Sequence, residues 1–389
     1  MTTHKDRKED YSKDHGAETG RERTRSARRG FLKGGAAAAV AAPAVVAASS
    51  LGYAAPKRTL RMQSSWQPGT TGYSIFEGWA KEMEELSDGE IGIKPFPAGA
   101  VSGDFQLMDA VRNGVLDGMN VFTVYWAGRM AAGVFLSSYP MGLNHPHMWD
   151  MLFDSYGGRA MADELYRGFG LRFIGHVHHD MNLIHAKKPV TSLDGLKGLK
   201  LRVPGGIVAD CFADIGAQTT LLPGSDVYPA LEKGSIDAAD FVGPAVNYDL
   251  GFHQVTDYIV MGPTSTPCLH QPVDLMDISL STRVYDSLSD RMKKLLPELV
   301  DAYSRRHYAG IQEANKNAWP KYEEAGVEVT RLSEADVTRF REVAIPNWFK
   351  WANKDASAAR LFQLHLQVMQ NPEVALIEKS DIKGYSLDL

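Results

Sequence analysis

The chain has 389 residues, of which 44% are hydrophobic, 23% charged and 10% aromatic, and its formal net charge is −5. This composition excludes a disordered, collagen-like or disulfide-scaffold protein, and the length favours two domains at about 150 residues each. Two cysteines are too few for a disulfide framework or a four-cysteine metal site. No apolar run reaches the roughly 18 residues that a membrane-spanning helix needs.

The charge is divided unevenly along the chain. Residues 1–55 carry ten Lys and Arg against six Asp and Glu, a net charge of +4. The other residues carry 32 basic against 41 acidic side chains, a net charge of −9. Because a protein neutralises nucleic-acid phosphates with a basic surface, the acidic body argues against a nucleic-acid partner.

The basic front of the chain is typical of an export signal. The run 28–33 (Arg-Arg-Gly-Phe-Leu-Lys) precedes an apolar stretch over 36–48, and small residues follow. This is the order of a secretory signal. The adjacent arginines resemble a twin-arginine signal, although Ala27 stands where Ser or Thr is usual. We expect residues 1–55 to be a leader and the mature protein to lie in the periplasm.

Strand-like and helix-like hydrophobic spacing alternate after the leader. We expect strands over 59–64, 91–96 and 118–123, and helices over 72–86 and 105–112 between them. This β-α-β-α-β order predicts a parallel sheet with helices on its faces.

The end of the chain is expected to be mostly helical. The spacing predicts helices over 289–317, 333–354 and 356–370, and Pro320 and Pro346 punctuate this part of the chain.

One ten-residue pattern occurs twice. Residues 109–118 (DAVRNGVLDG) and 229–238 (PALEKGSIDA) each end a helix at Gly and lead through Asp into a strand. Chance similarity of a common helix–strand unit is one interpretation. The other is two α/β domains of like construction, whose strands bring Asn120 and Asp240 toward a shared cleft.

Several residues that could bind a metal ion or a ligand stand near expected strand ends. The chain contains no GxGxxG, GxxxxGK[ST], GxSxG, HExxH or CxxC motif. The usual sequence signatures of nucleotide-binding proteins, serine hydrolases and zinc proteases are therefore absent. His176, His178, His179 and Asp180 form either a metal site or a hydrogen-bonded cluster, whereas His145 and His147 sit in a turn. The large aromatic residues that either line a cleft or pack in the core are Trp66, Tyr125, Trp126 and Phe241.

The segment 196–202 (Leu-Lys-Gly-Leu-Lys-Leu-Arg) resembles the DLKGLKIR segment of the solute-binding proteins of tripartite ATP-independent periplasmic (TRAP) transporters. Residues 98–139 and 226–237 look like that family's corresponding segments in the first and second domains. Residues 240–244 (Asp-Phe-Val-Gly-Pro) and 250–252 (Leu-Gly-Phe) are similar to the Glu-Trp-Val-Gly-Pro and Leu-Gly-Phe elements of its 2-oxo-acid and monocarboxylate-binding branch. The resemblance covers nearly the whole mature chain in matching order.

The resemblance implies an α/β, periplasmic-binding-protein-like fold with two α/β domains around a cleft and a helical C-terminal part. Domain I would comprise 56–178 plus about 266–300, and domain II 179–265 plus the C-terminal helices over about 301–389. The implied function is that of an extracytoplasmic receptor that closes around a small carboxylate (pyruvate, another 2-oxo acid or lactate) by hinge motion. The receptor would then dock on the membrane permease subunits of a TRAP transporter.

The resemblance makes Arg202 the carboxylate clamp, because a planar guanidinium forms two parallel hydrogen bonds with a carboxylate. Asp240 takes the place of a metal-binding Glu and is one methylene shorter, and Phe241 would offer its carbonyl oxygen. The implied ion is Na⁺ or Ca²⁺ bridging the substrate, and the shorter side chain leaves the ion's presence and position open. Asn182 is expected to contact cation or substrate, with Asp180 as the alternative.

Further substrate contacts are expected from residues that follow the Gly-Pro bend and the crossover. Asn247 and Tyr248 either hydrogen-bond the substrate or stabilise a turn. His270 and Gln271 are expected to reach the cleft, together with Trp66.

The competing hypothesis is a periplasmic metal-dependent enzyme acting on a small organic acid, because the twin-arginine route often exports proteins folded around cofactors. We expect a receptor rather than an enzyme. The bound carboxylate, a homodimer through the C-terminal helices and the pairing of Cys211 with Cys268 stay open.

Overall fold

The structure is a computed structural model that describes residues 57–389, which belong to one compact unit. The expected leader over 1–55, with its twin-arginine motif, lies outside the described residues and stays a prediction. In the described part of the chain, no helix combines the length and the apolar character required to cross a bilayer.

In the described chain the first sheet has the strand order β2-β1-β3-β10-β4. Strand β1 pairs in parallel with β2 and β3, whereas β10 runs antiparallel to β3 and β4. The strands are β1 Arg58–Ser64, β2 Ile91–Phe96, β3 Gly118–Val121, β10 Leu275–Ser281 and β4 Leu171–His178. The predicted parallel β-α-β-α-β unit is confirmed, and β10 and β4 make the whole sheet mixed.

The second sheet has the order β11-β9-β5-β8-β6-β7 and is also mixed. Strand β6 pairs in parallel with β7 and β8, and β5 runs antiparallel to β8 and β9. The strands are β5 Ile184–Ala186, β6 Lys200–Arg202, β7 Gln218–Thr220, β8 Ala238–Asp240, β9 Tyr258–Met261 and β11 Glu328–Arg331. We call each sheet with its helices the first and the second lobe.

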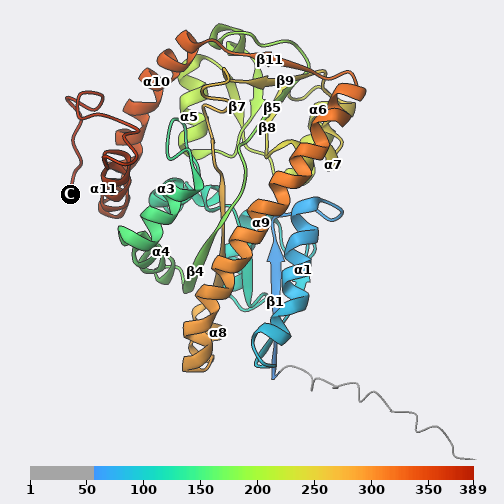
Figure 1. Ribbon diagram of the computed structural model, residues 1–389, viewed down its shortest axis with the longest axis vertical. Helices are drawn as coiled ribbons and strands as arrows, with labels where there is room; N and C mark the ends of the chain where they lie inside the picture. The colour runs from blue at the N-terminus through green and yellow to red at the C-terminus, as the bar shows by residue number, and fades with distance from the viewer. Residues whose placement is uncertain (1–56) are drawn as a thin grey trace, which may run out of the picture. The chain divides into compact units, whose positions relative to one another are not determined.

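Helices cover both sheets (Figure 1). Their bounds are α1 Thr71–Leu86, α2 Leu107–Arg112, α3 Pro146–Asp150, α4 Gly158–Arg167, α5 Gly206–Ile215, α6 Gly224–Glu232, α7 Pro244–Asp249, α8 Thr282–Asp286, α9 Asp290–Glu324, α10 Glu334–Ala352 and α11 Ala356–Met369. The expected α/β fold with a helical C-terminal part is therefore confirmed.

The two prolines that punctuate the C-terminal part of the sequence both lie inside helices. Helix α9 continues through Pro320, and α10 continues through Pro346. Proline removes one N–H donor and crowds the preceding turn, but tertiary packing keeps these two helices continuous. Tyr322, two residues after Pro320, is buried and its hydroxyl donates to the Pro244 carbonyl oxygen at 3.0 Å. The predicted helix 289–317 therefore ends too early, whereas the predicted helix 333–354, which includes Pro346, is confirmed.

The repeated ten-residue pattern forms the same turn twice. The glycines that end α2 and α6 have positive φ, 77° at Gly114 and 72° at Gly234, which glycine adopts without a steric penalty. The two residues after Gly114 donate their N–H groups to the Ala110 carbonyl oxygen, and those after Gly234 donate to Ala230. Each turn leads into a strand, β3 or β8, so the two lobes share this unit.

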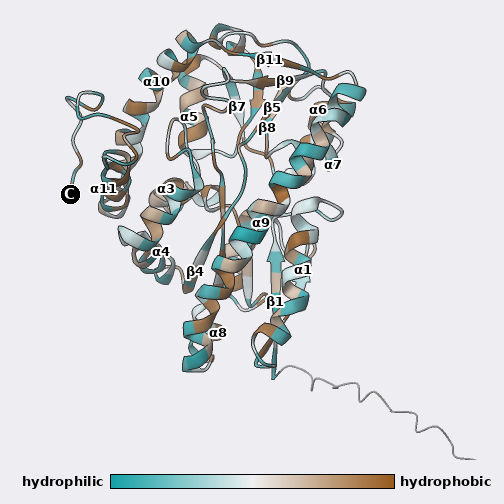
Figure 2. Ribbon diagram, viewed as in Figure 1, coloured by the Kyte–Doolittle hydropathy of each residue, from teal (hydrophilic) through white to brown (hydrophobic). Residues whose placement is uncertain are grey.

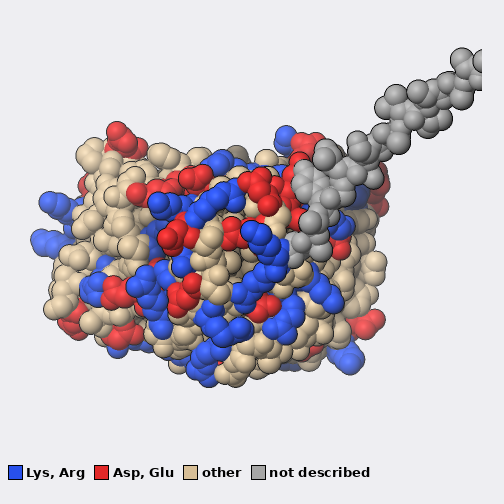
Figure 3. Space-filling view, turned by 90° about the horizontal axis from the view of Figure 1, so that it is seen from below, with Lys and Arg blue, Asp and Glu red and all other residues tan. Residues whose placement is uncertain are grey.

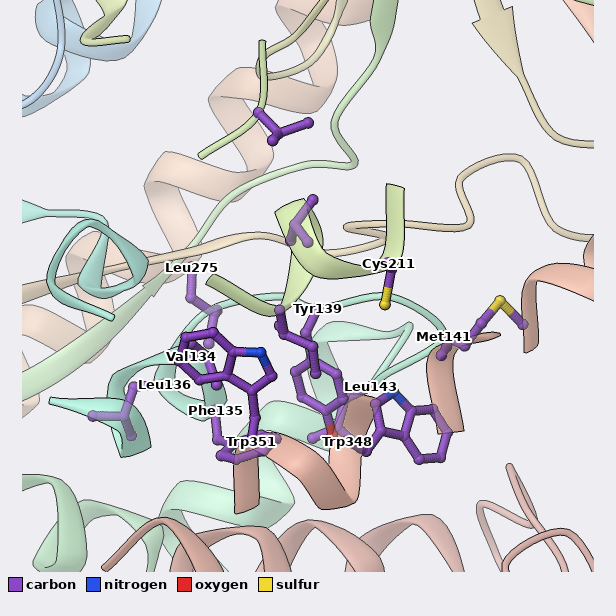
Figure 4. Close-up of a cluster of buried hydrophobic side chains, with 14 of the residues drawn as sticks. Val134, Phe135, Leu136, Tyr139, Met141, Leu143, Cys211, Leu275, Trp348 and Trp351 are labelled. Carbon is purple, nitrogen blue, oxygen red and sulfur yellow. The ribbon is translucent and has the colours of Figure 1, made fainter. Parts of the chain in front are cut away.

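A buried aromatic cluster joins the C-terminal helices to the segment before α3 (Figure 4). Trp348 of α10 donates Nε1–H to the Pro140 carbonyl oxygen at 2.8 Å, and the Tyr139 hydroxyl lies 3.0 Å from Nδ1 of His365 in α11. Cys211 belongs to this cluster; it and Cys268 are both buried free thiols.

Helix α9 lies against both lobes. It contacts β4 and α1 of the first lobe and α7 of the second, and Figure 1 shows it running obliquely along the molecule. Hydrophobic and hydrophilic residues alternate along it (Figure 2), as expected for a helix with one buried face. A domain boundary near residue 300 would fall within this continuous helix, and the expected boundaries stay a prediction.

Acidic and basic side chains are mixed on the face of the molecule that forms the underside in the view of Figure 1. Figure 3 shows basic and acidic side chains interspersed on that face. Pairs such as Arg61 with Asp117 (3.0 Å) and Arg306 with Glu82 (2.6 Å) neutralise each other on the described surface. This face therefore offers little long-range attraction for an anion.

Candidate functional site

A pocket that we call the Arg202 pocket lies where strand ends from both lobes meet. Its residues follow β3 in the first lobe and β6 and β8 in the second, and the crossover segments between the sheets complete it. Open α/β sheets bind ligands at this position, outside the carboxyl ends of strands. The lining residues are Phe122, Val124, Tyr125, Asn182, Arg202, Pro204, Phe241, Val242 and Asp274.

Arg202 ends β6 and is only 2% exposed. Its Nε and Nη2 atoms donate to the Leu222 carbonyl oxygen at 3.0 and 2.9 Å, and Nη1 donates to the Asp240 carbonyl oxygen at 2.7 Å. These bonds fix the plane of the guanidinium and leave two of its five N–H groups for other acceptors. The Asp240 Oδ2 atom is 4.0 Å from Nη1, which is too far for a hydrogen bond.

Two of the predicted aromatic residues flank this guanidinium. Its central carbon lies 5.0 Å from the ring centre of Phe241. Burial raises the pKa of the Tyr125 hydroxyl well above its usual value, although the neighbouring charge of Arg202 acts in the opposite direction. The phenol is therefore neutral and able to donate a hydrogen bond to an anion.

Asn182 and Gln271 are hydrogen-bonded to each other. The Asn182 Nδ2 atom donates to Gln271 Oε1 at 3.0 Å, and Gln271 Nε2 donates to Asp274 Oδ2 at 3.2 Å. The Asn182 Oδ1 atom is buried and has no partner among residues 57–389. An unpaired buried acceptor costs about 1–3 kcal/mol, so a donor or cation at this atom would be stabilising.

Two buried carboxyl groups near Arg202 were absent from the sequence prediction. Asp274 lines the pocket, and burial raises its pKa to about 7. Asp104 precedes α2; burial likewise raises its pKa to about 7, although the charge of Arg202 opposes this shift. Neither residue belongs to a recognisable motif, and only the crossover connection brings Asp274 to the pocket.

Asp240 and His270 are in direct contact. His270 Nε2 lies 2.8 Å from Asp240 Oδ1, and His270 Nδ1 lies 3.6 Å from the Cys268 sulfur. Burial lowers the pKa of His270, but the interactions with Cys268 and Asp240 outweigh it and raise the pKa to about 10. The Asp240 Oδ2 atom is buried without a hydrogen-bond partner in the described chain.

Trp66 lies in the core and not in the pocket lining. Its ring is fully buried and contacts Phe122 edge-on, with ring centres 5.5 Å apart. It also packs 4.7 Å from the ring of His179. Trp126 is buried as well and packs against Tyr166.

Asn247 and Tyr248 of α7 also do not line the Arg202 pocket. The Asn247 Nδ2 atom donates to the Val242 carbonyl oxygen and so supports the pocket wall from behind. The Tyr248 ring stacks on His253 with ring centres 3.9 Å apart. The structure thus places Asn247 where it stabilises the turn.

The carboxylate of Asp180, the alternative to Asn182, already accepts hydrogen bonds from a main-chain N–H and from a side-chain amide. Its Oδ1 atom accepts the Gly243 N–H at 3.2 Å, and Oδ2 accepts from Asn315 of α9. His179 is paired with Asp180 and packs on Trp66.

The remaining histidines of the expected cluster are separate from that pair. His176 and His178, alternate residues of β4, both contact Asp150 of α3. His145 and His147 are exposed.

The two positions that the repeat predicted at a cleft are held within the sheets. Asn120 accepts the Ser64 hydroxyl at 3.1 Å and donates to the Asp277 carbonyl oxygen at 3.1 Å, and it does not line the pocket. The residues two positions further along, Phe122 and Val242, are the ones that line it.

Two α/β lobes with a buried arginine between them define the class of two-lobed solute-binding proteins. The chain belongs to the family described as bacterial extracellular solute-binding protein, family 7, whose model matches residues 62–355. Its members include solute-binding proteins of TRAP transporters, so the resemblance found in the sequence is confirmed.

Individual relatives agree with this assignment. A monocarboxylate 2-oxoacid-binding periplasmic protein of Nostoc sp. is 26% identical over 317 residues, covering 81% of this chain and 85% of the relative. TRAP solute-binding proteins of Pseudoalteromonas atlantica, solved with sodium and pyruvate, and Colwellia psychrerythraea, solved with calcium and pyruvate, share the fold with TM-scores of 0.75. Each of these two is 21% identical; they cover 85% and 82% of this chain and are themselves covered over 100% and 96%.

Proposed function

We propose that the chain is the extracytoplasmic receptor of a TRAP transporter and binds a small monocarboxylate such as pyruvate, another 2-oxo acid or lactate. The observation that carries this proposal is Arg202, a buried guanidinium held in one plane by main-chain oxygens with two N–H groups left over. A carboxylate accepts two parallel hydrogen bonds from such a group, and the low local dielectric strengthens the attraction.

The lining of the pocket favours a small acid with a short carbon chain. Phe122, Phe241 and Val242 provide an apolar wall for a short carbon chain, and the Tyr125 hydroxyl provides one further donor. The name of the Nostoc relative, a monocarboxylate 2-oxoacid-binding protein, supports the same ligand class.

The oxygen atoms around the pocket fit a hard cation. Asn182 Oδ1 and Asp240 Oδ2 are buried acceptors without partners in the described residues, and Asp274 adds a carboxylate in the lining. Na⁺ and Ca²⁺ take carboxylate, amide and main-chain oxygens, so these residues would hold the ion that bridges the substrate. Within this proposal Phe241 keeps its predicted role through its carbonyl oxygen. A bound cation would favour the ionised form of Asp274, whose pKa burial raises to about 7.

The liganded receptor would dock on membrane permease subunits after the lobes close around the ligand. Export through the twin-arginine route and a homodimer through the C-terminal helices stay predictions from the sequence. The alternative of an enzyme drew on His176, His178, His179 and Asp180, and these residues do not meet at the Arg202 pocket.

Ligand identification tests the proposal. The protein is purified under mild conditions, and any retained small molecule is identified by mass spectrometry. A thermal-shift panel of mono-, di- and tricarboxylates, sugars and amino acids, each with and without Ca²⁺, follows. The proposal requires stabilisation by a short monocarboxylate, and a panel in which only sugars or amino acids stabilise the protein would contradict it.

A further inference from the structure

A second cluster of ligating side chains lies at the edge of the first sheet, away from the Arg202 pocket. We call Asp150 of α3 with His176 and His178 of β4 the His-Asp cluster. The Nε2 atoms of the two histidines lie 3.1 and 2.8 Å from the same Asp150 oxygen, Oδ1. One donor atom from each residue lies within 4.8 Å of the others.

The surrounding structure holds these rings in place. His176 and His178 alternate along β4, so both side chains point to the same face of the strand. The His176 ring stacks on Phe153 with ring centres 4.3 Å apart and an interplanar angle of 9°. The main-chain N–H of His178 donates to the Ser304 hydroxyl of α9 at 2.9 Å. The imidazoles therefore converge without any rearrangement of the strand.

The spacing suits a tetrahedral transition-metal ion. Zn²⁺ binds imidazole nitrogen and carboxylate oxygen at about 2.0–2.2 Å in tetrahedral geometry, which puts neighbouring donor atoms about 3.3–3.5 Å apart. The two nitrogen–oxygen distances of 3.1 and 2.8 Å would lengthen by about 0.3 and 0.6 Å to reach this spacing. Imidazole ligands favour Zn²⁺ and similar ions over Na⁺ or Ca²⁺.

The local charge also favours a cation. Arg159 is the basic residue next to the cluster, and its Nη2 atom pairs with Asp154 at 2.9 Å and Asp301 at 3.0 Å, so these two carboxylates outnumber it.

We infer that Asp150, His176 and His178 form a binding site for one Zn²⁺-type divalent metal ion, with an open coordination position toward solvent. The histidine side chains are 4% and 5% exposed, whereas that of Asp150 is 50% exposed, so the ion enters from the Asp150 side. A bound ion would fasten α3 to β4. The site shares no residue with the Arg202 pocket and does not rest on the proposed function.

Co²⁺ is a suitable probe, because tetrahedral coordination gives strong visible absorption that Zn²⁺ then abolishes by displacement. We expect chelator-treated wild-type protein to bind one Co²⁺ per chain with this spectrum, and Zn²⁺ to raise its melting temperature. Asp150→Asn and, separately, His178→Gln should each weaken Co²⁺ binding by about 100-fold or more, because changes to outer-shell partners alone cost 10–100-fold.

Two controls separate this site from others. The double variant His145→Ala/His147→Ala removes the exposed N-cap histidine of α3 and an exposed histidine within α3, and it should keep the spectrum, as should Arg202→Ala in the other pocket. Melting curves in metal-free buffer show that each variant is folded. Absence of the tetrahedral spectrum in the wild type, or wild-type affinity in either folded ligand variant, overturns the inference.

Discussion

Arg202 donates an Nη1 hydrogen bond to the main-chain oxygen of Asp240 at 2.7 Å, which joins the carboxyl ends of the neighbouring strands β6 and β8. The bond uses the backbone of Asp240 and leaves its carboxylate to His270. The position of the guanidinium is therefore set by main-chain geometry, independently of whether a ligand or a cation is bound.

Asn182→Ala should weaken binding of the monocarboxylate with its cation. The substitution removes the unpaired Oδ1 atom at the pocket and also the partner of Gln271 Oε1. A lost contact of about 1–3 kcal/mol corresponds to roughly a 5- to 150-fold lower affinity in calorimetry. Asn317→Ala on the exposed face of α9 is the matched control, and equal affinities in the two variants would contradict a role for Asn182.

Gly243→Ala should destabilise the fold and disturb the pocket wall. A Cβ atom at residue 243 would stand 1.7 Å from Asp180 Oδ2, which is itself buried and hydrogen-bonded. Such overpacking typically costs about 1–3 kcal/mol of unfolding free energy. Gly78→Ala in α1 meets no atom within 4 Å and should stabilise the protein by about 0.5–1 kcal/mol. Denaturant titration measures both changes, and a Gly243→Ala variant as stable as wild type would show that Asp180 moves freely.

Trp348→Ala should cost about 3–5 kcal/mol of unfolding free energy, because a fully buried ring is lost and the Pro140 carbonyl oxygen loses its donor. Since Trp348 ties α10 to the segment before α3, the loss tests whether the C-terminal helices are integral to the fold. Trp319→Ala, at a half-buried position, should cost clearly less in the same denaturant titration. Similar costs for the two variants would contradict this role.

His365 should contribute to acid destabilisation. Burial lowers its pKa to about 3, although the hydrogen bond to the Phe135 carbonyl oxygen acts in the opposite direction. In the unfolded chain this histidine takes up a proton below about pH 6.5, whereas in the folded chain it stays neutral until about pH 3. Its contribution to stability is therefore lost as the pH falls from 6.5 toward 3, by up to about 1.4 kcal/mol per pH unit.

The variant His365→Gln isolates this effect, because glutamine does not titrate. The difference in unfolding free energy between wild type and variant should shrink as the pH is lowered from 7 to 5. A difference that stays constant over this range would show that His365 does not titrate on unfolding.

The fold could be predicted well from local patterns. Alternation and helical spacing gave β1, α1 and β2 almost to the residue, and the repeated Gly-x-x-Asp unit correctly indicated two lobes of like construction. The predicted end of a helix at residue 317 was wrong, because tertiary packing continues α9 through Pro320 to Glu324.

The candidate site was only partly accessible from sequence. Arg202, Tyr125 and Phe241 line the pocket at or after strand ends, Asn182 lines it from the segment between β4 and β5, and their roles stay predictions. A residue's place along the chain does not say which way its side chain points, and Trp66 and Asn247 point away from the pocket. Asp274 and Asp150 come from segments without a motif, and only long-range contacts place them beside Arg202 and His176.

The most direct test of the central claim is isothermal titration calorimetry of pyruvate, with Ca²⁺ present, into wild-type protein and into Arg202→Ala. The exposed variant Arg339→Ala serves as the matched control. The account predicts one binding site in wild type and control, and no measurable binding in a folded Arg202→Ala protein. Unchanged affinity in Arg202→Ala would contradict the clamp and with it the proposed mode of ligand recognition.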